Sequence, residues 1–198
     1  MTEPGKNVQR GQATRHHVVT VATRLFAERG YEATSIDAVL HEAGVSRGSL
    51  YHHFPGKDAL FEAVLEAVEE RVGAEVVSAT AGSADPVDGL RAGCQAWVRL
   101  AGDPVVQRIL LVDAPAVLGW QRWRDLEERH ALGLLRAALQ AVADTGRLAP
   151  DLVDVFAHVV LAAMNEIALL VAQAHDPTAE QQAGTAAVDE VLDRLLGV

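Results

Sequence analysis

Apolar residues recur at helical spacing over most of this 198-residue chain. Val18, Ala22, Leu25 and Phe26 lie one, three or four positions apart, a spacing that places side chains on one face of an α-helix. No segment has the sustained alternation of apolar and polar residues that a half-buried strand needs. The pattern predicts an all-α fold.

Turn and capping residues divide the N-terminal part into three helices. The first is expected to end near Gly30, which can adopt the left-handed conformation found after helices. Thr34 or Ser35 can cap a short second helix, and Ser46 can cap a third. Because Pro55 lacks an amide hydrogen and cannot continue a helix, the third helix is predicted to end just before it.

The same helical pattern continues to the end of the chain. A long amphipathic helix is predicted over 58–78. Five more helices are predicted at about 86–101, 104–118, 121–144, 151–174 and 178–196. We therefore divide the chain into an N-terminal domain, 1–57, and a helical C-terminal domain, 58–198. The first dozen residues have almost nothing apolar to bury, so we expect them to be disordered.

The two domains differ in charge. The whole chain carries 17 Lys and Arg against 27 Asp and Glu, a net charge of −10 with neutral histidines. Residues 1–57 hold seven basic and five acidic residues, a net charge of +2, and also five of the eight histidines. A mildly basic module on an acidic body is typical of a protein that meets phosphate at one end.

The composition disfavours several classes of protein. Cys94 is the single cysteine, so no intramolecular disulfide can form, and no zinc-ligand spacing is present. The polar start, 1–17, lacks the apolar centre of a signal peptide. The most apolar stretch, 155–171, is interrupted by three polar residues and falls short of an uncharged membrane span. We expect a soluble cytoplasmic protein without a cofactor, a bound metal or membrane contact.

The second and third predicted helices have the spacing of a helix-turn-helix. Gly44 and Val45 form the tight turn between them, and in this motif the first helix braces the second against the major groove of DNA. The outward face of the second of these helices carries Arg47, Ser49 and His52, and no acidic residue occurs in it or directly after it. Arginine can read guanine and hydroxyl groups can bind phosphate, so this face is predicted to contact DNA.

The run AGVSRGSLYHHF at 43–54, followed by Lys57, resembles the TetR (tetracycline-repressor-like) family of bacterial regulators. The resemblance covers about the first 60 residues and includes Leu25-Phe26 and Gly30-Tyr31 upstream. Leu40 stands where the family usually has a small residue, which leaves the packing of the second helix against the third open. The C-terminal two-thirds resembles the family only in length and helical character.

The resemblance implies DNA contacts for individual residues. Ser35 would touch a phosphate near the start of its helix, and Arg47 and Gly48 would approach base edges. Contacts with phosphates or bases are also implied for Ser49, Tyr51, His52, His53 and Lys57. Simpler alternatives remain, because Tyr51 could pack within the domain, Lys57 could be a solvated side chain and Gly48 could relieve crowding.

For the C-terminal domain the resemblance implies dimerisation and a small organic effector. The sequence supports the dimer independently, because the helix at 153–171 is apolar on nearly every side and needs a second surface to cover it. Small and branched residues of the last helix would complete a four-helix interface: Ala183, Ala187, Val191 and Leu195.

Effector-binding candidates are polar or aromatic residues in otherwise apolar helices. They are Trp97, Asp113, Trp120, Trp123, His158, Asn165 and Glu166. For each of them a place in the core or a hydrogen bond to the backbone is the simpler alternative.

Rival functions are weaker. The run 44–48 matches the G-x-S-x-G elbow of α/β-hydrolases, but that elbow needs a strand before the serine, where this chain has a short helix, so we expect no enzyme. The histidine pairs 16–17 and 52–53 cannot easily share a metal ion, since adjacent helical residues point about 100° apart. A helical carrier or scaffold without DNA binding remains the alternative.

The favoured function is a repressor that binds an inverted-repeat operator in double-stranded DNA as a homodimer and is released by its effector.

Overall fold

The computed structural model describes residues 6–174 and 176–197, and every regular element in this part of the chain is a helix. The all-α prediction is confirmed. The N-terminal elements are α1 (Lys6–Ala33), α2 (Ile36–Ala43), α3 (Arg47–His53) and α4 (Lys57–Thr80). The remainder comprises α5 (Pro86–Leu100), a π-helical segment (Val106–Asp113), α6 (Ala114–Leu118), α7 (Trp120–Glu127), π-helical turns (Glu128–Leu132), α8 (Gly133–Asp144), a 3-10 turn (Pro150–Leu152), α9 (Val153–Gln173) and α10 (Pro177–Leu196).

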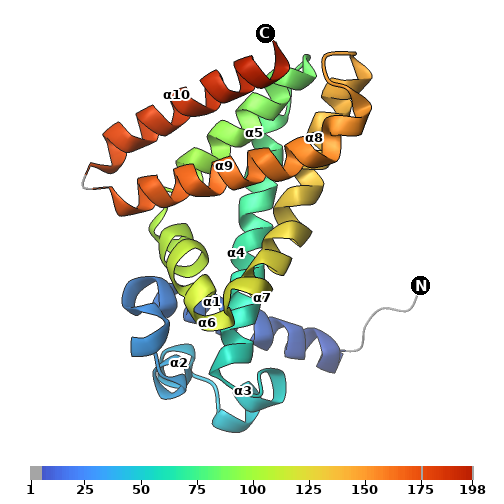
Figure 1. Cartoon of the computed structure of the whole chain (residues 1–198). Coiled ribbons are helices and arrows are strands. Elements are labelled where there is room, and N and C mark those ends of the chain that lie inside the picture. Colours follow the sequence, from blue (N-terminus) through green and yellow to red (C-terminus); the bar gives the residue numbers. More distant parts are fainter. Residues whose placement is uncertain (1–5, 175, 198) are drawn as a thin grey trace.

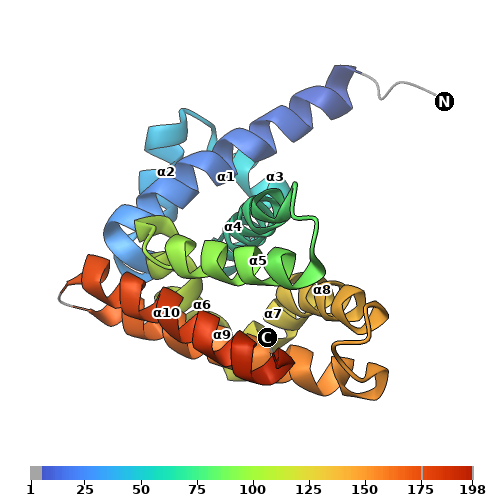
Figure 2. The same ribbon diagram turned by 90° about the horizontal axis from the view of Figure 1, so that it is seen from above.

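Helix α4 runs through the middle of the molecule and connects its two ends (Figure 1). Helices α1, α2 and α3 gather at one end of α4, and α9 and α10 lie side by side at the other, as the view from above also shows (Figure 2). A movement of α4 would therefore shift residues at both ends of the molecule.

Helix α1 begins at Lys6, well before the apolar residues that predict it. The expectation of disorder over the first dozen residues is therefore wrong for 6–12, while 1–5 lie outside the described residues. Extending an existing helix costs far less than starting one, so the polar turns before Val18 can continue the buried helix without a core of their own.

Gly30 ends the straight part of α1, as predicted. Its φ of 79° and ψ of 167° lie outside the helical region, and a Cβ at this position would stand 1.8 Å from Nη2 of Arg108. Glycine is therefore required both for the backbone turn and for the close approach of Arg108. The buried hydroxyl of Thr34 donates to the carbonyl of Gly30 at 2.8 Å and holds the chain that leads into α2.

The predicted helix over 104–118 differs in detail from the structure. Asp103 Oδ1 accepts from the backbone N–H of Val105 at 2.7 Å and starts the segment, which continues in wide π-helical turns before α6. Leu110 packs in one core and the next residue, Leu111, in the other. The segment lies between two cores, and its wide turns place neighbouring side chains in both of them. The spacing of apolar residues in the sequence does not predict these wide turns.

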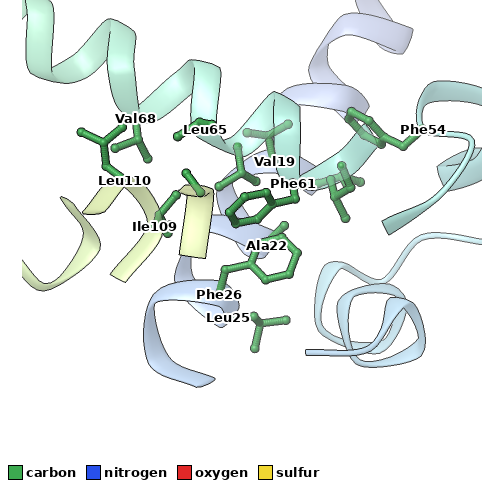
Figure 3. Close-up of a cluster of buried hydrophobic side chains, with 14 of the residues drawn as sticks. Val19, Ala22, Leu25, Phe26, Phe54, Phe61, Leu65, Val68, Ile109 and Leu110 are labelled. Atoms are coloured by element: carbon green, nitrogen blue, oxygen red, sulfur yellow. The ribbon is translucent and has the colours of Figure 1, made fainter. Parts of the chain in front are cut away.

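Two hydrophobic cores hold the helices together. The first joins α1, α2, α3 and α4 with the π-helical segment and α7. Figure 3 shows side chains of α1, α4 and the π-helical segment converging in it. Phe26 and Phe61 meet edge to face in it, with ring centroids 5.3 Å apart. The second core joins α5, α8, α9 and α10. Helix α4 contributes buried residues from Leu60 to Val72 to the first core and packs against α5 of the second, so it connects the two ends of the molecule.

Helix α9 buries one face and exposes another. With the turn before it, Pro150–Gln173 has the length and mean hydropathy, 2.0, of a membrane span, so it passes the composition test that the sequence argument expected it to fail. It packs against α5, α8 and α10. Its other face exposes 56% of Val155, 47% of Val159 and 51% of Leu170. This apolar face is large enough to need an explanation.

Candidate nucleic-acid interface and effector cavity

Caps fix the two helices of the predicted helix-turn-helix, whose presence is confirmed. Gly44 adopts the left-handed conformation at φ 64° and ψ 28° and ends α2. Ser46 Oγ accepts from the N–H of Ser49 at 3.2 Å, and Ser35 Oγ accepts from the N–H of Ala38 at 3.1 Å. Ser35 rather than Thr34 is therefore the cap of α2, and its exposed hydroxyl stands at the helix start where a phosphate contact was expected.

The inner side of the motif is apolar. Val39 and Ala43 of α2 and Leu50 of α3 are buried in the first core, and Val45 of the turn packs against it. Leu40, which departs from the family pattern, is half-buried and packs on the same core. The larger side chain is therefore accommodated at the edge of the core, and α3 keeps its support.

The outer side of α3 carries most of the expected DNA contacts. Arg47, Gly48, Tyr51 and His52 are exposed, while Ser49 and His53 are half-buried. Tyr51 exposes 42% of its surface, so it does not pack away inside the domain. A Cβ on Gly48 would meet no atom within 4 Å, so this glycine is not needed to relieve crowding in the chain itself. The absence of a side chain there leaves room for another molecule to approach the helix.

Arg47 forms an ion pair with Asp37 of α2. Both side chains are largely exposed, and the guanidinium carbon of Arg47 also lies 6.0 Å from the centre of the Tyr51 ring. Helix α3 itself lacks acidic residues, and Asp37 was not predicted from the sequence because α2 brings it alongside only in the folded motif. The pair occupies Nη2 of Arg47, and the guanidinium has further N–H donors.

Lys57 is held at the start of α4. Its Nζ donates to the carbonyl of Glu32 at 3.3 Å and lies 4.0 Å from the centre of the Tyr31 ring. Lys57 is therefore in contact with the end of α1 and is not a freely solvated side chain. A phosphate that approached Lys57 would meet an ammonium group already positioned by the end of α1.

The histidine pairs do not form a metal site in the described part of the chain, where no group of three or more His, Cys, Asp or Glu residues could hold an ion. His17 Nε2 donates to the carbonyl of Ala43 at 3.1 Å and so ties α1 to the end of α2. The rings of His52 and His53 meet edge to face, with centroids 5.1 Å apart and ring planes at 68°.

Asp113 lies at the junction between the two ends of the molecule instead of in an effector cavity. Its buried carboxylate accepts from the N–H of Tyr31 at 2.7 Å and from Nε of Arg108 at 3.3 Å. Tyr31 in turn hydrogen-bonds through its hydroxyl to Asp58 of α4, and burial together with this bond raises the pKa of the Tyr31 phenol. These contacts link α1, α4 and the π-helical segment.

A cavity of about 410 Å³ lies between α4, α5, α8 and α9. Valine, leucine and alanine make up half of its lining residues, which suits a small organic molecule. Of the effector candidates, Trp97 and Asn165 line it. Cys94 also lines it, and burial raises the pKa of its thiol to about 12, so the thiol is un-ionised and unreactive at neutral pH.

The other effector candidates lie elsewhere. Trp123 is buried in the first core, and Trp120 beside it on α7 exposes 63% of its surface to solvent. His158 and Glu166 are on the exposed face of α9. His158 and Asn165 share a helical face by their spacing, but α8 and α5 cover only part of α9. The first is therefore exposed, and the second lines the cavity. Sequence reasoning missed Glu69 and His130 of the cavity, because a charged residue in an amphipathic helix is usually solvated.

Comparison with known proteins gives consistent matches. The family model for bacterial regulatory proteins of the tetR family matches residues 18–64, and the model for the tetracyclin repressor-like C-terminal domain matches 87–195, more than half of the chain. The regulator AcrR of Shigella flexneri is 41% identical over 68 residues, which are 34% of this chain and 32% of AcrR. The aligned parts span about a third to a half of the length of the first curated relatives.

Solved structures extend the likeness over the whole chain. A TetR-family transcriptional regulator from Pectobacterium atrosepticum is 30% identical, with a TM-score of 0.83 over 95% of this chain and 96% of that one. RolR, solved in complex with resorcinol, shares the fold at 22% identity, with a TM-score of 0.72 over 96% of this chain and 91% of RolR. Given these matches and the helix-turn-helix in the structure, this chain belongs to the TetR family of bacterial regulatory proteins.

Proposed function

We propose that this protein is a cytoplasmic transcriptional repressor that binds an inverted-repeat operator as a homodimer and is released by a small organic effector. The observation that carries the proposal is the outer face of α3, where Arg47, Tyr51 and His52 are exposed beside the open surface at Gly48. The buried Leu50 on the opposite side holds this face outward. A helix supported in this way can enter a major groove.

The exposed face of α9 supports dimerisation. Val155, Val159 and Leu170 form an apolar stripe with little cover in a single chain, and Ala183 and Ala187 of the neighbouring α10 are exposed next to it. Val191 and Leu195 are half-buried on the same helix. A second copy that packs these two helices against its own would bury the stripe in a four-helix interface.

The cavity and the junction support regulation by an effector. Helix α4 lines the cavity with its middle and last turns and carries Lys57 and Asp58 at its first turn, next to α1. A ligand that favours one position of α4 would change the separation of the two α3 helices in a dimer. Such a coupling is typically about 1 to 3 kcal/mol and is set by the ligand's differential affinity for the two states. RolR, which shares this fold, binds resorcinol in its crystal structure.

The test begins with selection of binding sites from random double-stranded DNA, followed by fluorescence anisotropy on the selected sequence. We expect a palindromic site with half-sites about 34 to 36 Å apart, or one helical turn. Arg47→Ala should weaken binding to it, whereas Arg136→Ala, on exposed α8, should not. Failure to enrich any sequence, with equally weak binding by both variants and the wild type, would support the alternative of a helical carrier without DNA binding.

A cavity-filling variant tests the effector role separately. Ala138 lines the cavity and Gln140 lies on the exposed side of the same helix. Ala138→Phe should keep operator affinity and lose release by the effector, whereas Gln140→Phe should keep both. Release that survives in Ala138→Phe would show that the effector acts from another place.

A further inference from the structure

The closed end of the cavity carries a carboxylate. Along α4 the lining changes from buried Glu69 and Val72 to Val77, which is half exposed. Ser83 and Ala84, which follow α4 in the chain, also line the cavity and are exposed. The opening therefore lies near Val77 and Ser83, and Glu69 lies at the far, buried end.

Acidic groups dominate the charge of the lining. In the part of the chain that the structure describes, the lining contains Glu69, Asp85 and His130 and neither lysine nor arginine. Asp85 is at the rim, where Arg147 binds both of its oxygens at 2.9 and 2.6 Å and lowers its pKa. Nε2 of His130 lies 3.9 Å from a carboxylate oxygen of Glu66, an exposed residue of α4. Glu69 is therefore the acidic group that a bound molecule would meet at the closed end.

We propose that the effector of this cavity is an organic amine or other organic cation with an apolar body, whose N–H groups bind to Glu69. The inference rests on the proposed effector role and adds the chemical class of the ligand. Glu69 already interacts with a neighbouring group. A carboxylate has about four lone-pair sites, so it can accept a further donor. Charge-assisted hydrogen bonds of this kind are among the stronger ones in proteins.

The opposite charge would be disfavoured. A ligand carboxylate at the same place would set two negative groups close together in an apolar, poorly screened environment. Trp97 completes the apolar wall. Its Nε1 donates to the carbonyl of Met164 at 3.2 Å, which fixes the indole between α5 and α9.

The experiment uses three probes with one apolar body: 6-phenylhexylamine, 6-phenylhexanol and 6-phenylhexanoate. Their affinities for the full-length protein are measured by titration calorimetry. We expect the amine to bind about tenfold or more tightly than the carboxylate. Glu69→Gln should bring the ratio of the two affinities close to one. Glu70→Gln, at the next and exposed position of α4, removes the same charge and should keep the wild-type ratio.

Three results would overturn the ligand class: a carboxylate or alcohol that binds the wild type as well as the amine does, no detectable binding of the amine, or an equal effect of both variants. The wild-type ranking is decisive by itself even if Glu69→Gln folds poorly. Operator anisotropy on the same samples separates this inference from the proposed function. Amine binding without DNA release would refute regulation by this cavity and leave the ligand class standing. Release by the carboxylate would refute the ligand class and leave regulation standing.

Discussion

The backbone N–H of Tyr31 donates to the carboxylate of Asp113 at 2.7 Å, although the two residues are 82 positions apart in the chain. This bond joins the end of α1 to the end of the π-helical segment. The acceptor is a buried carboxylate, and hydrogen bonds to charged groups contribute more than those between neutral groups. It is therefore a direct mechanical link between the DNA-binding helices and the helices around the cavity.

Asp113→Ala should lower the free energy of unfolding by about 1 to 3 kcal/mol, since it leaves the N–H of Tyr31 without its acceptor. It should also weaken the response of operator affinity to an effector. Urea unfolding and anisotropy check the two effects. Asp144→Ala, which removes an exposed carboxylate at the end of α8, is the control and should change neither. An unchanged response in Asp113→Ala would mean that α4 alone carries the coupling.

Gly30→Ala should destabilise the protein for two separable reasons. The backbone at φ 79° is unfavourable for alanine, and the new Cβ would overlap the guanidinium of Arg108. The first effect costs about 1 to 3 kcal/mol, and the second can be relieved by moving Arg108. The double variant with Arg108→Ala should therefore recover only part of the loss in urea unfolding. Full recovery would show that the backbone is not strained.

Arg47 and Lys57 should affect DNA binding differently. Arg47→Ala should cost about 1 to 3 kcal/mol and relax the preference at one base per half-site, because a guanidinium can read guanine. Lys57→Ala should weaken all sequences alike and reduce the salt slope by about one, as expected for a phosphate contact. Tyr51→Phe should resemble the lysine variant. Site selection and salt titrations check these outcomes, and a changed sequence preference only in Lys57→Ala would reverse the assignment.

Asp37→Asn should tighten DNA binding, because it releases Arg47 from its ion pair and removes a negative charge beside the phosphates. Glu42→Gln provides a matched control, since Glu42 lies on the same helix and pairs with Arg24 at 2.6 Å. Anisotropy on operator and unrelated DNA measures both variants. If the two tighten binding equally, only the overall charge matters and the Asp37–Arg47 pair has no role of its own.

Leu170→Arg and Val159→Arg should each shift the protein from dimer to monomer by placing a charge in an apolar interface. Leu170 is a better choice than Leu169, which packs partly against the core of its own chain. Val8→Arg, at a valine of α1 that exposes 54% of its surface, is the control and should leave the oligomeric state unchanged. Analytical ultracentrifugation gives the masses. Dimers of normal stability in both α9 variants would place the interface elsewhere.

The sequence by itself determined the helices and the recognition motif, because these depend on interactions between residues near in the chain. Apolar spacing predicted the order of the helices, although π-helical turns divide two of them, 104–118 and 121–144, in the structure. Ser46 and Gly44 marked the limits of α3 and α2 within a residue. The outward position of Arg47 followed from the same periodicity. The irregular π-helical turns were not predictable, since they depend on two cores that meet at Leu110 and Leu111.

Only the tertiary structure decided which polar residues share a site. Asp113 and Asn165 are alike in sequence as polar positions in apolar helices, yet the first binds the end of α1 and the second lines the cavity. The ion pair of Arg47 with Asp37 and the buried position of Glu69 likewise depend on how helices pack. Spacing fixes the face of a helix on which a residue lies, but the element that covers this face is set by contacts between distant parts of the chain.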